Sequence, residues 1–141
     1  MDKFTGNVKG STNVGFEGTT EAEILHGYSL VDKETFVEVG RFDACTYSGN
    51  YFREETDLWL RMRQRDYRLF YEPSARTYVL KGINQGGQWS NMKGNLSRYE
   101  YYVFKNHYVF LRKFYGRRRY VMFPLFILQR MHGRLMDYLN R

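Results

Sequence analysis

The spacing of apolar residues predicts short elements up to residue 80 and longer helices after residue 96. Residues 54–65 are typical of a helix, because Leu58, Trp59 and Met62 fall on one stripe, acidic residues open the segment and arginines close it. Two segments rich in glycine and lacking sustained periodicity, 1–20 and 82–95, indicate loops. The other short elements predicted are a strand within 22–31, a helix over 33–39 capped by Asp32 and ended by Gly40, and strands over 67–71 and 76–80.

Two longer helices are predicted in the last part of the chain. Ser97 and Glu100 match a capping box, which predicts a helix start there, and Gly116 ends that helix. A second helix over 120–140 carries Pro124 in its first turn, where proline is tolerated. Its apolar stripe is continued by Leu128, Met131, Leu135 and Leu139.

The composition of the 141 residues is that of a folded chain without internal cross-links. At 43% hydrophobic and 26% charged residues it does not resemble a disordered tail. The single cysteine, Cys45, excludes an internal disulfide and a cysteine-rich zinc site. Met1 is followed by polar residues, Asp2 and Lys3, and not by the apolar core of a signal peptide, so we expect a cytoplasmic protein.

Charge divides the sequence into an acidic part and a basic part. Residues 1–60 carry 5 basic and 11 acidic side chains, a balance of −6, and residues 61–141 carry 17 and 4, a balance of +13. The two balances sum to the net charge of +7. This division predicts a basic surface that meets an anionic partner. Phosphate-bearing small molecules, nucleic acid and anionic lipid all fit that description, although no nucleic-acid-binding motif is recognised.

The acidic run Glu54-Glu55-Thr56-Asp57 admits two interpretations. Carboxylates favour helix N-termini for electrostatic reasons and need no catalytic purpose there. Alternatively, a carboxylate at an exposed helix start can act as a general base on a hydroxyl group.

Three strings in order along the chain resemble the second half of family 2 glycosyltransferases. They are Gly40 to Asp43, the segment Arg53 to Arg61 with its Glu-Glu-x-Asp-Leu core, and Tyr67 to Ala75 with its Pro-x-Ala ending. The likeness extends from residue 23 to residue 106. It implies an α/β protein, a partial nucleotide-sugar transferase fold with a short mixed sheet and flanking helices, followed by C-terminal helices. The chain would divide into an acceptor-side part, 1–96, and basic, aromatic helices, 97–141.

The resemblance also implies a chemistry and roles for particular residues. The family transfers a sugar from a nucleotide-sugar donor to an acceptor hydroxyl with inversion. The position of the catalytic base falls on Glu55, with Glu54 and Asp57 beside it; Asp57 would orient or cap, and Arg61 would anchor the helix by an ion pair. The candidate substrate-binding residues are Arg61 and Trp89, whose indole either stacks on a sugar ring or pins its loop to the core.

The resemblance implies a divalent metal, Mg²⁺ or Mn²⁺, whose ligands are not in this sequence. The family holds the metal with an Asp-x-Asp motif, and none occurs in the 141 residues. Val79 or Leu80 stands where the family often has a histidine near the metal. The three histidines, His26, His107 and His132, lack ligand spacing. We therefore expect donor and metal to bind a missing N-terminal half or another chain, and the isolated chain to be inactive.

The basic C-terminal part suggests a location for the acceptor. Its longest apolar run, 121–128, is too short for a membrane span of about 20 residues, but it can lie in an interface beside Arg117–Arg119. A lipid-linked or polysaccharide acceptor at the inner face of a membrane is then expected. Two other interpretations stay open: a non-catalytic binding or interaction module on the same scaffold, and a basic membrane-surface or nucleic-acid binder.

Overall fold

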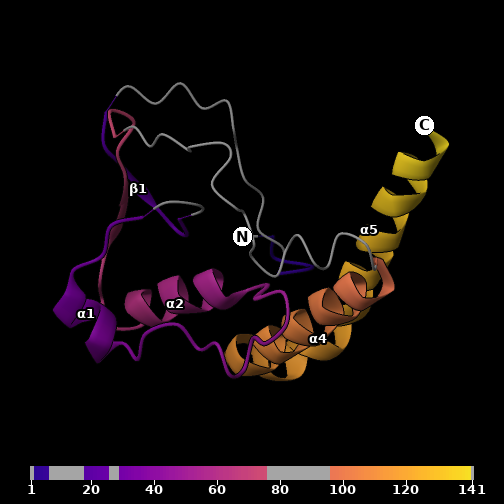
Figure 1. The fold of residues 1–141 in the computed structure, drawn as a ribbon, viewed down its shortest axis with the longest axis horizontal. Helices are drawn as coiled ribbons and strands as arrows, with labels where there is room; N and C mark the ends of the chain where they lie inside the picture. The colour runs from indigo at the N-terminus through magenta and orange to yellow at the C-terminus, as the bar shows by residue number, and fades with distance from the viewer. Residues whose placement is uncertain (1, 7–17, 26–28, 76–95, 141) are drawn as a thin grey trace, which may run out of the picture.

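The computed structural model describes residues 2–6, 18–25, 29–75 and 96–140. In chain order the elements are β1 (Thr20–Ala22), α1 (Lys33–Glu38), α2 (Glu54–Arg63), β2 (Leu69–Tyr71), α4 (Leu96–Tyr115), the 3₁₀ helix η1 (Gly116–Arg118) and α5 (Arg119–Leu139). Figure 1 shows the sheet, α1 and α2 on one side of the molecule and the pair α4 and α5 on the other. Helices combined with a small sheet agree with the predicted α/β class, whereas the transferase fold stays a prediction.

The described sheet is an antiparallel pair of short strands. Thr20 pairs with Tyr71 and Ala22 with Leu69. Of the three β2 residues only Leu69 is buried, so one side chain anchors the ribbon to the core. The prediction of a strand within 22–31 was wrong for the described residues of that range beyond Ala22, because 23–25 and 29–31 are irregular. Ile24, Leu25 and Val31 nevertheless pack against the core, whereas Leu30 is exposed. The strand expected at 76–80 and the loop at 82–95 lie outside the described residues.

Local signals account for α1 and α2. The Asp32 carboxylate accepts the amide hydrogen of Thr35 at 2.9 Å and caps α1, and Gly40 ends the turn after it with φ of +90°. Acidic residues fill the first turn of α2 and arginines its last, which complements the helix dipole. The helix ends at Arg63, two residues before the predicted end, and Asp66 adopts a left-handed conformation with φ of +63°.

The helices α4 and α5 form an antiparallel hairpin across η1. The capping box predicted for α4 was wrong, because Ser97 lies inside the helix and the Glu100 carboxylate faces α5. It accepts from Nε of Arg130 at 2.8 Å and from Nη2 of Arg134 at 2.5 Å. Pro124 also lies deeper than predicted, in the second turn, because α5 already begins at Arg119.

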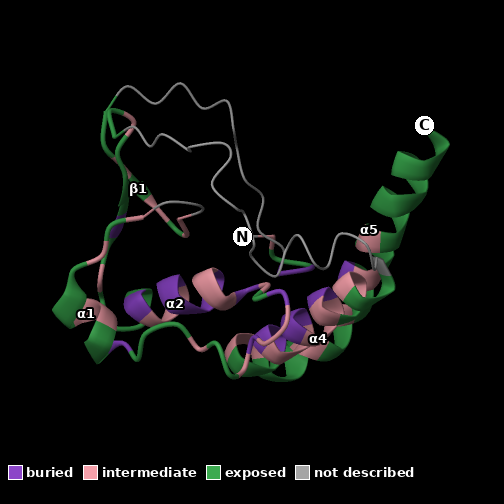
Figure 2. Cartoon of the chain, in the orientation of Figure 1, coloured by how far each residue is buried: buried purple, intermediate pink, exposed green. Residues whose placement is uncertain are grey.

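Two clusters of buried side chains form the core. The first joins α1, α2 and the sheet, and the second joins the 43–52 loop to the helical hairpin. Figure 2 shows that burial falls along α5, whose C-terminal part is exposed on all sides. None of the helices in the described ranges is long and apolar enough to span a lipid bilayer. The first cluster contains Val39, Leu58, Trp59, Met62 and Leu69, and the second Tyr47, Phe110, Leu111 and Met122.

Candidate functional site

The acidic start of α2 separates into accessible and buried carboxylates. Arg53, with φ of +79°, turns the chain sharply into the helix. Glu54 and Glu55 in the first turn are half-buried, whereas Thr56 and Asp57 are buried. Burial, and secondarily the charge of Glu55, raises the pKa of the Glu54 carboxyl. The helix start therefore presents two adjacent glutamates at the surface, and the Glu54 carboxyl binds its proton more tightly than an ordinary glutamate does.

Asp57 is a buried anchor with three partners. Its side chain has no exposed surface, and Oδ1 accepts from the Tyr47 hydroxyl at 3.0 Å. Nε of Arg61 lies 2.6 Å from Oδ2, and Nζ of Lys113 lies 2.6 Å from Oδ1. The burial of Tyr47, together with the charge of Asp57, raises the pKa of the phenol above its usual value. Two cations and a hydroxyl therefore hold this carboxylate in place.

Arg61 connects α2 to the loop that follows α1. It makes an ion pair with Asp57, which lies four residues earlier on the same helix. Its Nη1 donates to the carbonyl of Val39, and its Nη2 donates to the carbonyl of Arg41 at 2.6 Å. Arg41 is left-handed, with φ of +58°, so the guanidinium holds an irregular turn against the helix. The described bonds of Arg61 all go to protein groups, and they tie the first resembling string to the second.

Several residues of this region were not singled out for a role by sequence reasoning. Lys113 reaches Asp57 from the last turn of α4. His107 is fully buried on the same helix and meets the side chain of Arg53. A signal for the second residue existed, because His107 stands four residues after Val103 and three before Phe110, on the apolar stripe of α4. No sequence pattern relates Lys113 to a carboxylate 56 positions earlier.

The described residues do not supply the metal site that the resemblance implies. Within the ranges 2–6, 18–25, 29–75 and 96–140, no three His, Cys, Asp or Glu side chains gather closely enough to hold a metal ion. Trp89, the second candidate substrate-binding residue, lies outside those ranges. What the structure brings together is therefore Glu54, Glu55, Asp57 and Arg61 on α2.

No protein-family model matches the chain, and no curated protein or solved structure matches it either.

Proposed function

We propose that the chain is the acceptor-side part of a family 2 glycosyltransferase, with Glu55 as the catalytic base. The observation that supports this most is the difference in exposure among the three carboxylates at the start of α2. Glu54 and Glu55 stand half-exposed in the first turn, while Asp57, two residues after Glu55, is fully buried and paired with two cations. A base needs access to its substrate, and the pair of glutamates has it.

The proposed reaction is a single displacement. A carboxylate oxygen of Glu55 takes the proton of an acceptor hydroxyl as its oxygen forms a bond to the anomeric carbon of the donor sugar. The bond from that carbon to the nucleoside diphosphate breaks, and the diphosphate leaves with the bonding electrons. Glu54 contributes a second carboxyl, and the raised pKa of Glu54 suits a group that shares a proton with its neighbour.

The donor-binding part of the reaction is proposed to lie elsewhere. Because the 141 residues contain no Asp-x-Asp motif, an adjoining segment or a second chain would hold the nucleotide sugar and the divalent metal. The same proposal places the chain on the cytoplasmic side, held peripherally at the inner face of a membrane. A lipid-linked acceptor would present its hydroxyl there.

The test measures sugar transfer from UDP- and GDP-linked sugars by the chain produced together with a donor-binding partner. Glu55→Gln is expected to lower kcat about 100-fold or more, because the amide takes up no proton. The matched control is Glu34→Gln, since Glu34 also lies in the first turn of a helix but on α1. Full transfer by Glu55→Gln would remove the base assignment and favour the non-catalytic module.

Glu54→Gln decides between the two adjacent glutamates. If it abolishes transfer while Glu55→Gln does not, the base is Glu54. Calorimetric titration of the isolated chain with UDP- and GDP-linked sugars is expected to show no binding. Tight binding there would contradict the half-enzyme proposal.

A further inference from the structure

The side of α5 that faces away from α4 is apolar along the length of the helix. Met122 and Phe126 are buried toward α4 and the core, whereas a second apolar set is exposed, with Val121 and Leu128 at 65% and 63%. The exposed set repeats every three or four residues, which places it on one face of a helix. We call this set the outer stripe: Val121, Leu125, Leu128, Leu135 and Leu139, with the polar His132 between Leu128 and Leu135.

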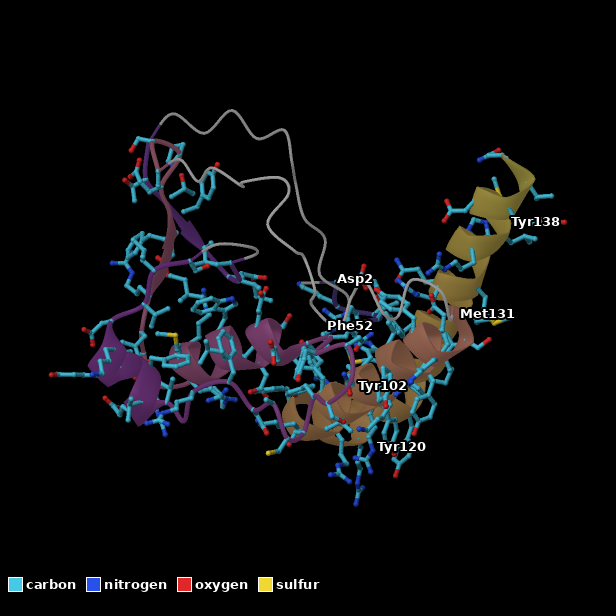
Figure 3. All side chains as sticks on the ribbon, in the orientation of Figure 1. Asp2, Phe52, Tyr102, Tyr120, Met131 and Tyr138 are labelled. Atoms are coloured by element: carbon cyan, nitrogen blue, oxygen red, sulfur yellow. The ribbon has the colours of Figure 1, made fainter. Side chains whose placement is uncertain are left out.

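Tyrosines border the outer stripe near both of its ends. Tyr120 and Tyr138 are exposed at 63% and 78%. Figure 3 shows Tyr138 on the part of α5 that projects beyond the rest of the molecule, with its ring directed outward. A tyrosine combines an apolar ring with a polar tip and therefore suits a boundary between apolar and aqueous surroundings.

Arginines continue the outer stripe at the turn of the hairpin. Arg117 and Arg118 stand four and three residues before Val121, and the backbone is right-handed at Arg118 and Arg119, where α5 begins. Both are exposed, and in the part of the chain that the structure describes neither makes an ion pair. Arg112, exposed on the last turn of α4, adds a third cation near this turn.

The positive charge of the helical hairpin indicates an anionic partner for the outer stripe. Between Tyr101 and Met136 there are eight Lys or Arg residues and no Asp or Glu, and three of the eight, Lys113, Arg130 and Arg134, pair with Asp57 or Glu100. Two copies of the chain that met through α5 would bring like charges together, which disfavours self-association. An anionic surface instead attracts this end of the hairpin, and a lipid boundary accepts a long apolar face without a matching shape.

We propose that α5 docks on a bilayer of anionic phospholipid. The outer stripe lies at the boundary between headgroups and acyl chains, and Arg117 and Arg118 contact the lipid phosphates. This proposal rests on the peripheral membrane position proposed above, and it names the protein surface and the lipid that would make the contact. It does not depend on the transferase chemistry.

The test is co-sedimentation of the 141-residue chain with vesicles. We expect binding to phosphatidylcholine vesicles that contain phosphatidylglycerol, weaker binding to phosphatidylcholine alone, and weakening by added salt. Arg117→Gln with Arg118→Gln is expected to lower the partition coefficient about 30-fold on the anionic vesicles, since each cation contributes about fivefold. Leu128→Gln with Leu135→Gln is expected to abolish binding to both kinds of vesicle.

The control for charge is Lys3→Gln with Lys33→Gln, two exposed lysines outside the hairpin, which is expected to leave binding within about twofold of the unchanged chain. Circular dichroism checks that each variant keeps its helix content. Equal binding to neutral and anionic vesicles, or none to either, would overturn the proposal. A second result would also overturn it: light scattering shows a dimer, the two leucine substitutions dissociate that dimer, and the vesicles bind no protein. Because no donor or acceptor is present, failure here leaves the transfer assay as a separate test.

Discussion

Arg53 donates the hydrogen on its Nε to Nδ1 of His107, over 3.1 Å and away from solvent. Because Nδ1 accepts, the ring hydrogen of His107 sits on Nε2, which donates to the carbonyl of Thr5 at 2.8 Å. One neutral imidazole therefore joins the start of α2, the N-terminal segment and α4. Burial, reinforced by the charge of Arg53, lowers the pKa of His107 to about 3.

This relationship predicts a pH dependence of stability. An unfolded histidine binds a proton near pH 6.5, whereas folded His107 stays neutral down to a pH of about 3. The unfolded state thus holds more protons between these values, and the free energy of unfolding falls as the pH is lowered from about 6.5. The slope from this group is at most about 1.4 kcal/mol per pH unit. Urea unfolding at several pH values above about 5, where most carboxyls stay ionised, measures it.

His107→Gln is the matched variant for that measurement. Glutamine keeps one acceptor for Arg53 and one donor for Thr5, but it does not titrate. The variant is expected to lose the slope between about pH 5 and 6.5. An equal slope in both proteins would show that His107 takes up its proton over the same pH range in the folded and unfolded states.

Asp57→Asn is expected to destabilise the protein by about 3–5 kcal/mol. The substitution keeps the size of the side chain but leaves Arg61 and Lys113 without their buried counter-charge. The control is Asp43→Asn, because Asp43 is half-buried and its oxygen lies 3.7 Å from the Lys113 nitrogen, so its loss is expected to cost less than about 1 kcal/mol. Chemical denaturation compares the two variants. Equal and small effects would mean that Asp57 is not an anchor.

Gly49→Ala is expected to cost about 2–4 kcal/mol. Gly49 has φ of +88°, and a Cβ added there would stand 2.3 Å from the nearest ring atom of Tyr102. Left-handed strain and overpacking each contribute. Gly133→Ala is the control, since a Cβ added at this helical glycine would meet no atom within 4 Å beyond its own helix backbone, and alanine there is expected to stabilise by up to about 1 kcal/mol. Thermal unfolding of both variants should show shifts of opposite sign.

The Glu100 to Arg130 contact is expected to couple α4 to α5 by about 1 kcal/mol. Burial alone would raise the pKa of Glu100, but the bonds from Arg130 and Arg134 outweigh it and hold the pKa below its usual value. Partial exposure screens the pair, which keeps the estimate modest. A double-mutant cycle with Glu100→Gln and Arg130→Gln measures the coupling. The exposed pair of Glu21 and Arg68 is the reference and is expected to show weaker coupling, because solvent screens both charges.

The elements that sequence reasoning predicted well are those with local causes. Asp32 and Gly40 bound α1 through contacts within a few residues, and the buried stripe of α2 follows from helical spacing. The capping box failed because a local pattern competed with distant partners. Glu100 meets two arginines about thirty positions later in the chain, and those bonds replace the expected one to the helix start.

In the candidate site too, contacts within one helix were predictable and contacts between distant segments were not. Glutamates 54 and 55 and the ion pair of Arg61 follow from positions within one helix. The burial of Asp57 did not, because its carboxylate also contacts Lys113, which lies 56 positions later in the chain. The pairing of Arg53 with His107 likewise depends on how α4 packs, and no spacing in the sequence encodes it.

The contacts of α4 set an order for the making of the protein. A ribosome synthesises residues 1–95 before α4, yet Arg53, the Thr5 carbonyl and Asp57 all find partners on that helix. Until α4 with His107 and Lys113 has been synthesised, the second cluster of the core cannot form. The first cluster, built from residues 24–69, can assemble earlier. During translation the first cluster would therefore assemble before the second.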